Sequence, residues 1–142
     1  MGMKDIIMFE IDEERYGFPI DFVREVVEVP KIMPVPETPD FLLGIINLRG
    51  EILAVIDTKM RLGLSKTQVD DMSKLIIVES DEHKAGFLVR KLPSVIHIDE
   101  EKIVDENFSL SPKVDAKYIA GVVEEEFLVI LRPEKLLSVN VD

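Results

Sequence analysis

Side chains that most often carry out catalysis or bind metals are scarce in this sequence. It has no cysteine, which excludes thiolate catalysis, thiolate zinc sites and disulfides, and it has two histidines, His83 and His97. His83 falls in an expected turn and His97 in an alternating strand, and neither has another histidine or a carboxylate at the spacing of metal ligands. We therefore expect no catalytic histidine, no metal and no cofactor.

Acidic side chains are the other candidates for chemistry, because paired carboxylates act as general acids and bases. Their clusters begin at Asp12, Asp99 and Glu124 and lie between apolar runs, where acidic residues usually form solvated turns. The sequence also lacks the P-loop, the dinucleotide fingerprint and the nucleophile elbow of hydrolases. A binding module is therefore favoured over an enzyme, and a small enzyme that uses carboxylates stays as an alternative.

The composition limits the partners and the compartment. Lys and Arg number 17 against 28 Asp and Glu, a net charge of -11, so the chain has no excess of positive charge with which to bind phosphates. No apolar run approaches the ~18 residues of a membrane helix, and acidic residues interrupt the N-terminal stretch where a signal peptide would need an apolar core. We expect a cytoplasmic protein that binds no nucleic acid and does not insert into a membrane.

Arg49 is unexpected in the most apolar part of this acidic chain. The stretch from Gly44 to Asp57, GIINLRGEILAVID, predicts two strands joined by a turn at Arg49 and Gly50. Gly50 is explained as a turn residue with positive φ. Arg49 has two explanations: an ion pair with Glu51 or another nearby acid, or contact with a protein partner, since arginine among aliphatic residues is common in interface hot spots.

Short strands should position this turn. Apolar runs of ~4–8 residues, rich in Ile and Val and bounded by turn residues, recur along the chain and predict a mainly β fold. The proline-rich segment 29–40 predicts an extended crossing. Three short helices are expected: 21–28 with Asp21 as its cap, 57–63 with Asp57 as its cap and Gly63 at its end, and 132–137 with Pro133 in its first turn.

The two halves of the chain resemble each other. Residues 9–29 align without gaps over 78–98, and residues 51–62 align over 126–137, with the elements in the same order. We therefore expect one domain over 1–142, built from two related β units in halves that run roughly from 5 to 65 and from 74 to 138. Closure into small barrels would leave fewer open sheet edges, and an exchange of strands between the halves stays open.

Three stretches resemble the CheW family of chemotaxis coupling proteins: YGFPIDFVREVVEV from Tyr16, PVPETPDFLLGIINLRGEILAVID from Pro34, and GFLVRKLPSVIHI from Gly86. They stand in the family's order, and the resemblance covers the chain from about Met8 to Leu137. It implies a fold of two intertwined five-stranded SH3-like β-barrels with short connecting helices. It also implies a protein that is not an enzyme, and that couples the regulatory domain of the histidine kinase CheA to the cytoplasmic signalling tips of chemoreceptors in membrane-associated arrays.

The resemblance also implies which positions bind these partners. Matched by position, they are Arg49, Gly50, Asn47, Leu48, Gly44, Val23 and Glu25. A receptor tip is a helical hairpin, so a groove between the barrels lined by aliphatic side chains would suit it. A related scaffold of another histidine-kinase pathway, serving surface motility or gene regulation, stays as an alternative within the same family.

Overall fold

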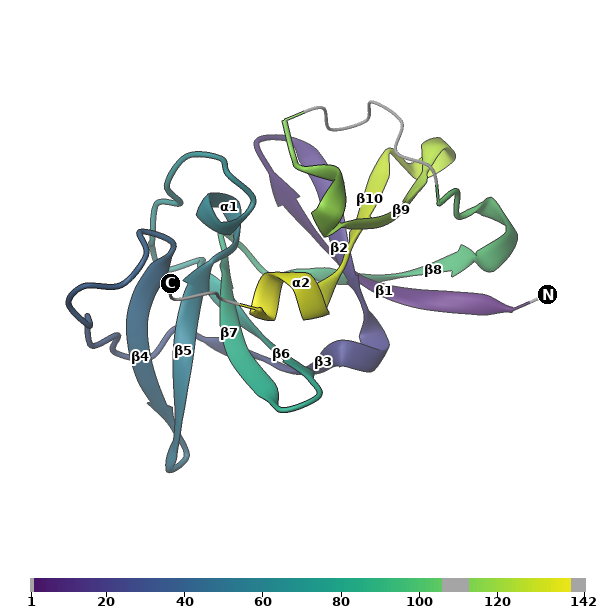
Figure 1. Cartoon of the computed structure of the whole chain (residues 1–142). Coiled ribbons are helices and arrows are strands. Elements are labelled where there is room, and N and C mark those ends of the chain that lie inside the picture. The colour runs from purple at the N-terminus through teal and green to yellow at the C-terminus, as the bar shows by residue number, and fades with distance from the viewer. Residues whose placement is uncertain (1, 106–112, 139–142) are drawn as a thin grey trace.

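A computed structural model describes residues 2–105 and 113–138, which form two small β-barrels lying side by side (Figure 1). A tight hairpin lies near the centre of each sheet. β1 (Met3–Ile11) pairs antiparallel with β2 (Glu14–Pro19), and β6 (Lys74–Ser80) pairs antiparallel with β7 (His83–Val89). The β1–β2 turn consists of Asp12 and Glu13, both with positive φ, which is the backbone twist that suits a two-residue hairpin.

Each sheet combines strands from both halves of the chain: barrel A takes strands from its two ends, and barrel B is formed by the five strands between them. Barrel A has the order β8 (Ser94–Asp99), β1, β2, β10 (Leu128–Leu131), β9 (Ile119–Val123), and barrel B has the order β3 (Val23–Glu28), β6, β7, β5 (Glu51–Asp57), β4 (Leu42–Leu48). In both, the second strand of the central hairpin runs parallel to a strand of the other hairpin, β10 or β5. The predicted fold of two intertwined five-stranded SH3-like barrels is confirmed. The repeat halves 5–65 and 74–138 stay a prediction, which the shared pairing pattern supports.

The strands alternate between separate hydrophobic cores, because successive side chains of a strand point to opposite faces. In β1, Ile6 and Met8 face the interior of barrel A, whereas Ile7 and Phe9 face barrel B. The interior of barrel B is filled by Ile46, Leu53, Val55, Leu75, Ile77 and Leu88. Between the barrels lies the largest cluster, the inter-barrel core, which consists of Ile7, Phe9, Ile11, Tyr16, Phe18, Ile56, Leu62, Ile76, Val78, Ala85, Phe87, Val89, Val114, Ile119, Val122, Val129, Leu131, Leu136 and Leu137.

An extended segment crosses an edge strand in each barrel. Met33, in the proline-rich segment, exchanges two backbone hydrogen bonds of 2.8 and 2.9 Å with Ile45 of β4. Val104 exchanges two of 2.9 Å with Val122 of β9 in the same way. Gly44 makes the first crossing possible, because a Cβ there would lie 2.2 Å from the Met33 carbonyl oxygen. The predicted extended crossing is thus present at Met33.

Two of the three predicted helices are present. α1 (Thr58–Arg61) begins after Asp57, whose carboxylate accepts hydrogen bonds from the backbone N–H groups of Lys59 and Met60. The chain turns away from α1 at Gly63, with φ +89°, and α2 (Pro133–Leu137) begins with its proline as predicted. Short 3₁₀ turns make further connections: η1 (Ile20–Phe22), η2 (Glu100–Lys102), η3 (Ala116–Tyr118) and η4 (Glu124–Glu126).

The predicted helix at 21–28 is wrong. Its residues form the end of η1 and then β3, which pairs antiparallel with β6 from Val23 opposite Val78 to Glu28 opposite Lys74. A register shift between Val23 and Glu25 sends Val26 toward the inter-barrel core and Val27 into barrel B. The free edge of β6 and the β-branched side chains, which favour strands, override the helical spacing of the apolar residues.

Asp57 also fixes the loop that follows α1. It is fully buried, and its carboxylate accepts hydrogen bonds from the backbone N–H of Thr67 at 2.9 Å and from the Thr67 hydroxyl at 2.6 Å. Four donors in all therefore surround this buried charge, so its desolvation is compensated.

Arg61 links the two barrels. Its guanidinium extends from α1 to the end of α2, donating hydrogen bonds of 3.0 Å to the carbonyl oxygens of Leu136, Lys135 and Ser138. It donates another of 2.8 Å to the Tyr118 hydroxyl and lies 4.7 Å from the centre of the Phe41 ring. These contacts satisfy carbonyl groups that the end of a helix leaves unpaired.

Within residues 2–105 and 113–138, no helix has the length and hydropathy that crossing a membrane requires.

Replacing Gly44 by alanine should destabilise the fold by about 3 kcal/mol or more, because the new Cβ would clash with backbone rather than with a movable side chain. Gly63→Ala is the matched control: its φ is also positive but nothing lies within 4 Å, so we expect a loss of about 1 kcal/mol. Urea unfolding measures both. Equal losses would contradict the assigned role of the close approach at Gly44.

Replacing Arg61 by alanine should cost about 2–3 kcal/mol, because four hydrogen bonds and two ring contacts are lost together. Arg90→Ala removes the same side chain from an exposed position and should change the free energy of unfolding by no more than about 0.5 kcal/mol. If thermal melts of the two variants coincide, Arg61 does not link the barrels.

Candidate partner-binding site

The tip of the β4–β5 hairpin carries the candidate cation. Leu48 pairs with Glu51, so Arg49 and Gly50 are the two central turn residues, and both have positive φ. Such a turn matches the twist of the flanking strands. The Asn47 side chain accepts a 2.8 Å hydrogen bond from the Gly50 backbone N–H. Asn47 therefore fixes the turn, and the turn fixes the backbone of the arginine.

Arg49 forms an ion pair with Glu25 of β3, which is 24 residues away in the chain. Glu51, the acid suggested by the sequence, pairs instead with Lys84 at 2.9 Å. The Arg49 side chain remains 66% exposed, and ion pairs this exposed contribute little to stability. The pair lies between the two edge strands of barrel B and orients the guanidinium without burying it.

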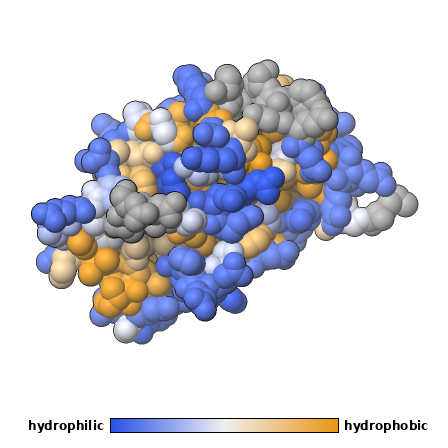
Figure 2. Space-filling view, in the orientation of Figure 1, coloured by the Kyte–Doolittle hydropathy of each residue, from blue (hydrophilic) through white to orange (hydrophobic). Residues whose placement is uncertain are grey.

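Exposed apolar side chains lie on the hairpin that carries this cation and on the segment that pairs with it. Ile52, directly opposite Asn47, is 58% exposed, and Met33, paired with Ile45, is 62% exposed. Directly opposite residues of paired strands share one face. Figure 2 shows an apolar patch over the lower part of the β4–β5 hairpin, at the lower left of the view. Ile52 was not among the residues predicted for the site, although its position next to the turn in an alternating strand is a signal for it.

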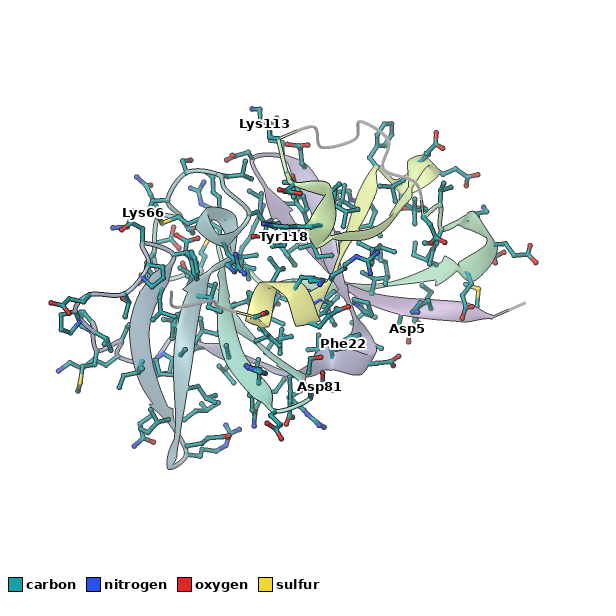
Figure 3. All side chains as sticks on the ribbon, viewed as in Figure 1. Asp5, Phe22, Lys66, Asp81, Lys113 and Tyr118 are labelled. Carbon is teal, nitrogen blue, oxygen red and sulfur yellow. The ribbon has the colours of Figure 1, made fainter. Side chains whose placement is uncertain are left out.

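Two of the predicted site residues have a structural role instead of an exposed position. Gly44 is buried beneath the crossing segment. Val23 is half-buried and packs against the inter-barrel core, as does Phe22, which Figure 3 shows in the space between the two barrels. The structure therefore brings Asn47, Leu48, Arg49, Gly50 and Glu25 together at one end of barrel B, while Gly44 and Val23 lie apart from this surface.

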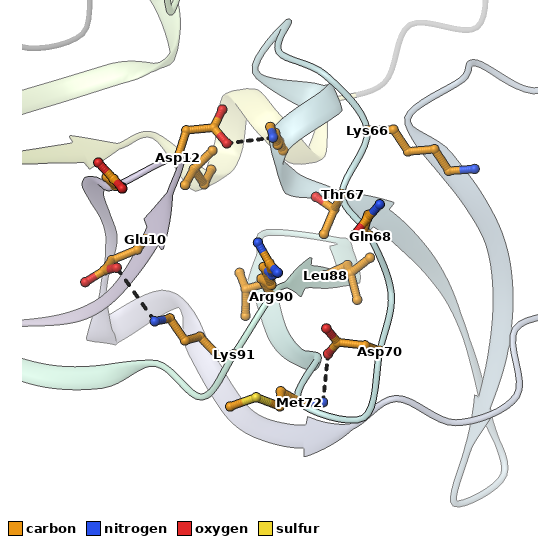
Figure 4. Close-up of a pocket in the computed structure, with 14 residues that line it drawn as sticks. Glu10, Asp12, Lys66, Thr67, Gln68, Asp70, Met72, Leu88, Arg90 and Lys91 are labelled. Atoms are coloured by element: carbon orange, nitrogen blue, oxygen red, sulfur yellow. Dashed lines mark hydrogen bonds and ion pairs between the residues drawn. The ribbon is translucent and has the colours of Figure 1, made fainter.

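A cleft of about 900 Å³ lies between the β1–β2 turn and the loop after α1 (Figure 4). Acidic and basic side chains alternate around it: Asp12 pairs with Lys59 at 2.8 Å, and Glu10 lies 3.9 Å from Lys91. The few apolar residues of its lining include Met72. The cleft is therefore not the aliphatic groove that the family resemblance suggested, and two of its carboxylates are matched by lysines.

Among the residues that the structure describes, no three His, Cys, Asp or Glu side chains are grouped so that they could hold a metal ion. The β4–β5 tip offers one exposed guanidinium on a fixed turn, with exposed apolar side chains on the same hairpin.

Known proteins resemble the chain over nearly its whole length. The family model described as the CheW-like domain matches residues 5–140. The chemotaxis protein CheW of Helicobacter pylori is 30% identical over 132 residues, which cover 93% of this chain and 80% of the relative. The chemotaxis protein CheW of Thermotoga maritima is 34% identical over 105 residues, which cover 74% of this chain and 69% of the relative.

The crystal structure of the scaffolding protein TtCheW from Thermoanaerobacter tengcongensis has the same fold. It superposes with a TM-score of 0.86 at 38% identity and covers 100% of this chain and 92% of that one. With the fold, the matched domain and these relatives in agreement, the chain belongs to the CheW-like domain family.

Proposed function

We propose that the chain is a non-catalytic chemotaxis adaptor that couples the regulatory domain of the histidine kinase CheA to the cytoplasmic signalling tips of chemoreceptors. The CheW-like domain and the relatives named chemotaxis protein CheW support the adaptor role. One observation carries the position of the coupling site: Arg49 is exposed on a turn that Asn47 and Glu25 hold in place. Because the geometry is fixed before binding, little conformational entropy is lost when a partner engages it.

The surroundings of Arg49 fit a protein surface as its ligand. A guanidinium has five N–H donors, and the ion pair with Glu25 leaves others free for a partner's carboxylate or carbonyl groups. Ile52 on the same hairpin and Met33 on the segment paired with it add exposed apolar area. Arginine is one of the residues most enriched in interface hot spots, and such recognition needs no bound cofactor.

The proposal also places the protein in the cytoplasm, where binding to receptor tips would recruit it to membrane-associated arrays. Two partners held by one rigid molecule raise each other's effective concentration, so modest individual affinities suffice in an array.

Binding of the purified chain to two probes tests this function: the regulatory domain of the kinase and a receptor signalling fragment from the same organism. Isothermal titration calorimetry should detect binding to each probe. Binding to neither would overturn the proposal.

Replacing Arg49 by alanine should weaken binding to at least one probe tenfold or more, about 1.4 kcal/mol, and leave the free energy of unfolding within about 1 kcal/mol of the original. Arg24→Ala is the control, because Arg24 forms a comparable exposed ion pair, with Glu79. Equal losses of affinity in the two variants would mean that general charge rather than the tip is recognised. A large loss of stability in the Arg49 variant would make it a fold residue.

A further inference from the structure

Phe127 combines an exposed aromatic side chain with a backbone conformation that is unfavourable for a bulky residue. Its side chain is 70% exposed, the highest value among the exposed large hydrophobic residues that the structure describes. Its backbone is left-handed, with φ 51° and ψ 43°, a conformation that favours glycine and is rare for a bulky residue. Neither feature contributes to the hydrophobic cores, so the fold gives no reason for a phenylalanine at this position.

The turn that carries Phe127 is firmly held. It connects β9 to β10, and the Phe127 backbone N–H donates a 3.1 Å hydrogen bond to the Glu124 carbonyl oxygen. Arg15 of β2 donates to the carbonyl oxygen of Glu126 at 3.0 Å and approaches its carboxylate at 3.3 Å. The exposed ring is therefore presented from a fixed turn.

The turn is also acidic. Glu124, Glu125 and Glu126 precede Phe127, and two of them form exposed ion pairs, Glu125 with Lys102 and Glu126 with Arg15. The hydrogen bond and the charge of Glu125 raise the pKa of the Lys102 amine, so Lys102 stays protonated near neutral pH. Three carboxylates against two cations leave the surface around the ring negative.

The Phe127 turn lies within the β9–β10 hairpin of barrel A, and the Arg49 turn lies within the equivalent β4–β5 hairpin of barrel B. The two turns lie at opposite ends of the molecule, at the upper right and the lower left of Figure 1. One presents a cation beside aliphatic side chains, and the other presents an aromatic ring beside carboxylates. Two turns that carry opposite charge and face opposite ways cannot both bind the same patch of one partner.

We infer that the β9–β10 turn is a second docking surface, on which Phe127 enters an apolar pocket rimmed by lysine or arginine on the globular regulatory domain of the kinase. A protruding ring needs a concave partner, which a globular domain offers and a two-helix rod does not. The surrounding glutamates match a basic rim. The inference rests on the proposed function and adds a contact that is separate from the Arg49 turn.

Phe127→Gly tests it sharply, because glycine removes the ring and relieves the left-handed backbone. The melting temperature should stay the same or rise, while affinity for the kinase regulatory domain falls tenfold or more and affinity for the receptor fragment is unchanged. Phe127→Tyr keeps the ring and should retain most of the binding. Leu92→Ala is the control, because it shortens another exposed apolar side chain, which is 68% exposed and lies outside this turn. This variant should bind like the original chain.

Each other outcome overturns a defined claim. If the chain binds the regulatory domain and Phe127→Gly binds it equally well, or loses only the receptor fragment, the docking surface is wrong while the proposed function stands. If Leu92→Ala is as weak as Phe127→Gly, the effect belongs to exposed apolar area in general and the inference fails. If the original chain binds neither probe, the proposed function fails and this inference fails with it.

Discussion

Five strands of the two sheets are buried on both faces, and this double burial determines how the two barrels fit together. β1, β5, β6, β7 and β10 each direct alternate side chains into a barrel and into the inter-barrel core. A register slip of one residue would exchange the two sets, so the pairing of these five strands is tightly specified. Because the inter-barrel core takes residues from both sheets and from α2, neither barrel has a complete core without the other. Arg61 reinforces this arrangement at the ends of α1 and α2.

This constraint leaves the hairpin turns as the places where the chain can vary its chemistry. The turns after β4 and after β9 join equivalent strands, yet one carries Arg49 and Gly50 and the other carries three glutamates and Phe127. Both are anchored by contacts from other strands, Glu25 in one case and Arg15 in the other. A rigid pair of barrels with different, pre-organised ends suits a protein that acts by holding partners in a fixed relation.

The sequence predicted the elements whose signals are local. The strands follow from short apolar runs, the start of α1 from Asp57, and the turn at Gly50 from its glycine. The prediction failed at residues 21–28, where helical spacing and β-branched composition disagree and only the free edge of β6 decides. It could not identify Glu25 as the partner of Arg49, because that contact depends on how barrel B brings its two edge strands together. Phe127 was also missed, because the exposure of a large apolar side chain is a property of the folded chain.

A three-component sedimentation experiment measures directly whether one molecule of the proposed adaptor holds a kinase domain and a receptor tip at the same time. The kinase regulatory domain and the receptor fragment are mixed with and without the chain. Analytical ultracentrifugation then measures how much material sediments as a complex that contains both. We expect a ternary complex that forms only when the chain is present. Binary complexes that exclude each other, so that added receptor fragment displaces the kinase domain, would contradict it.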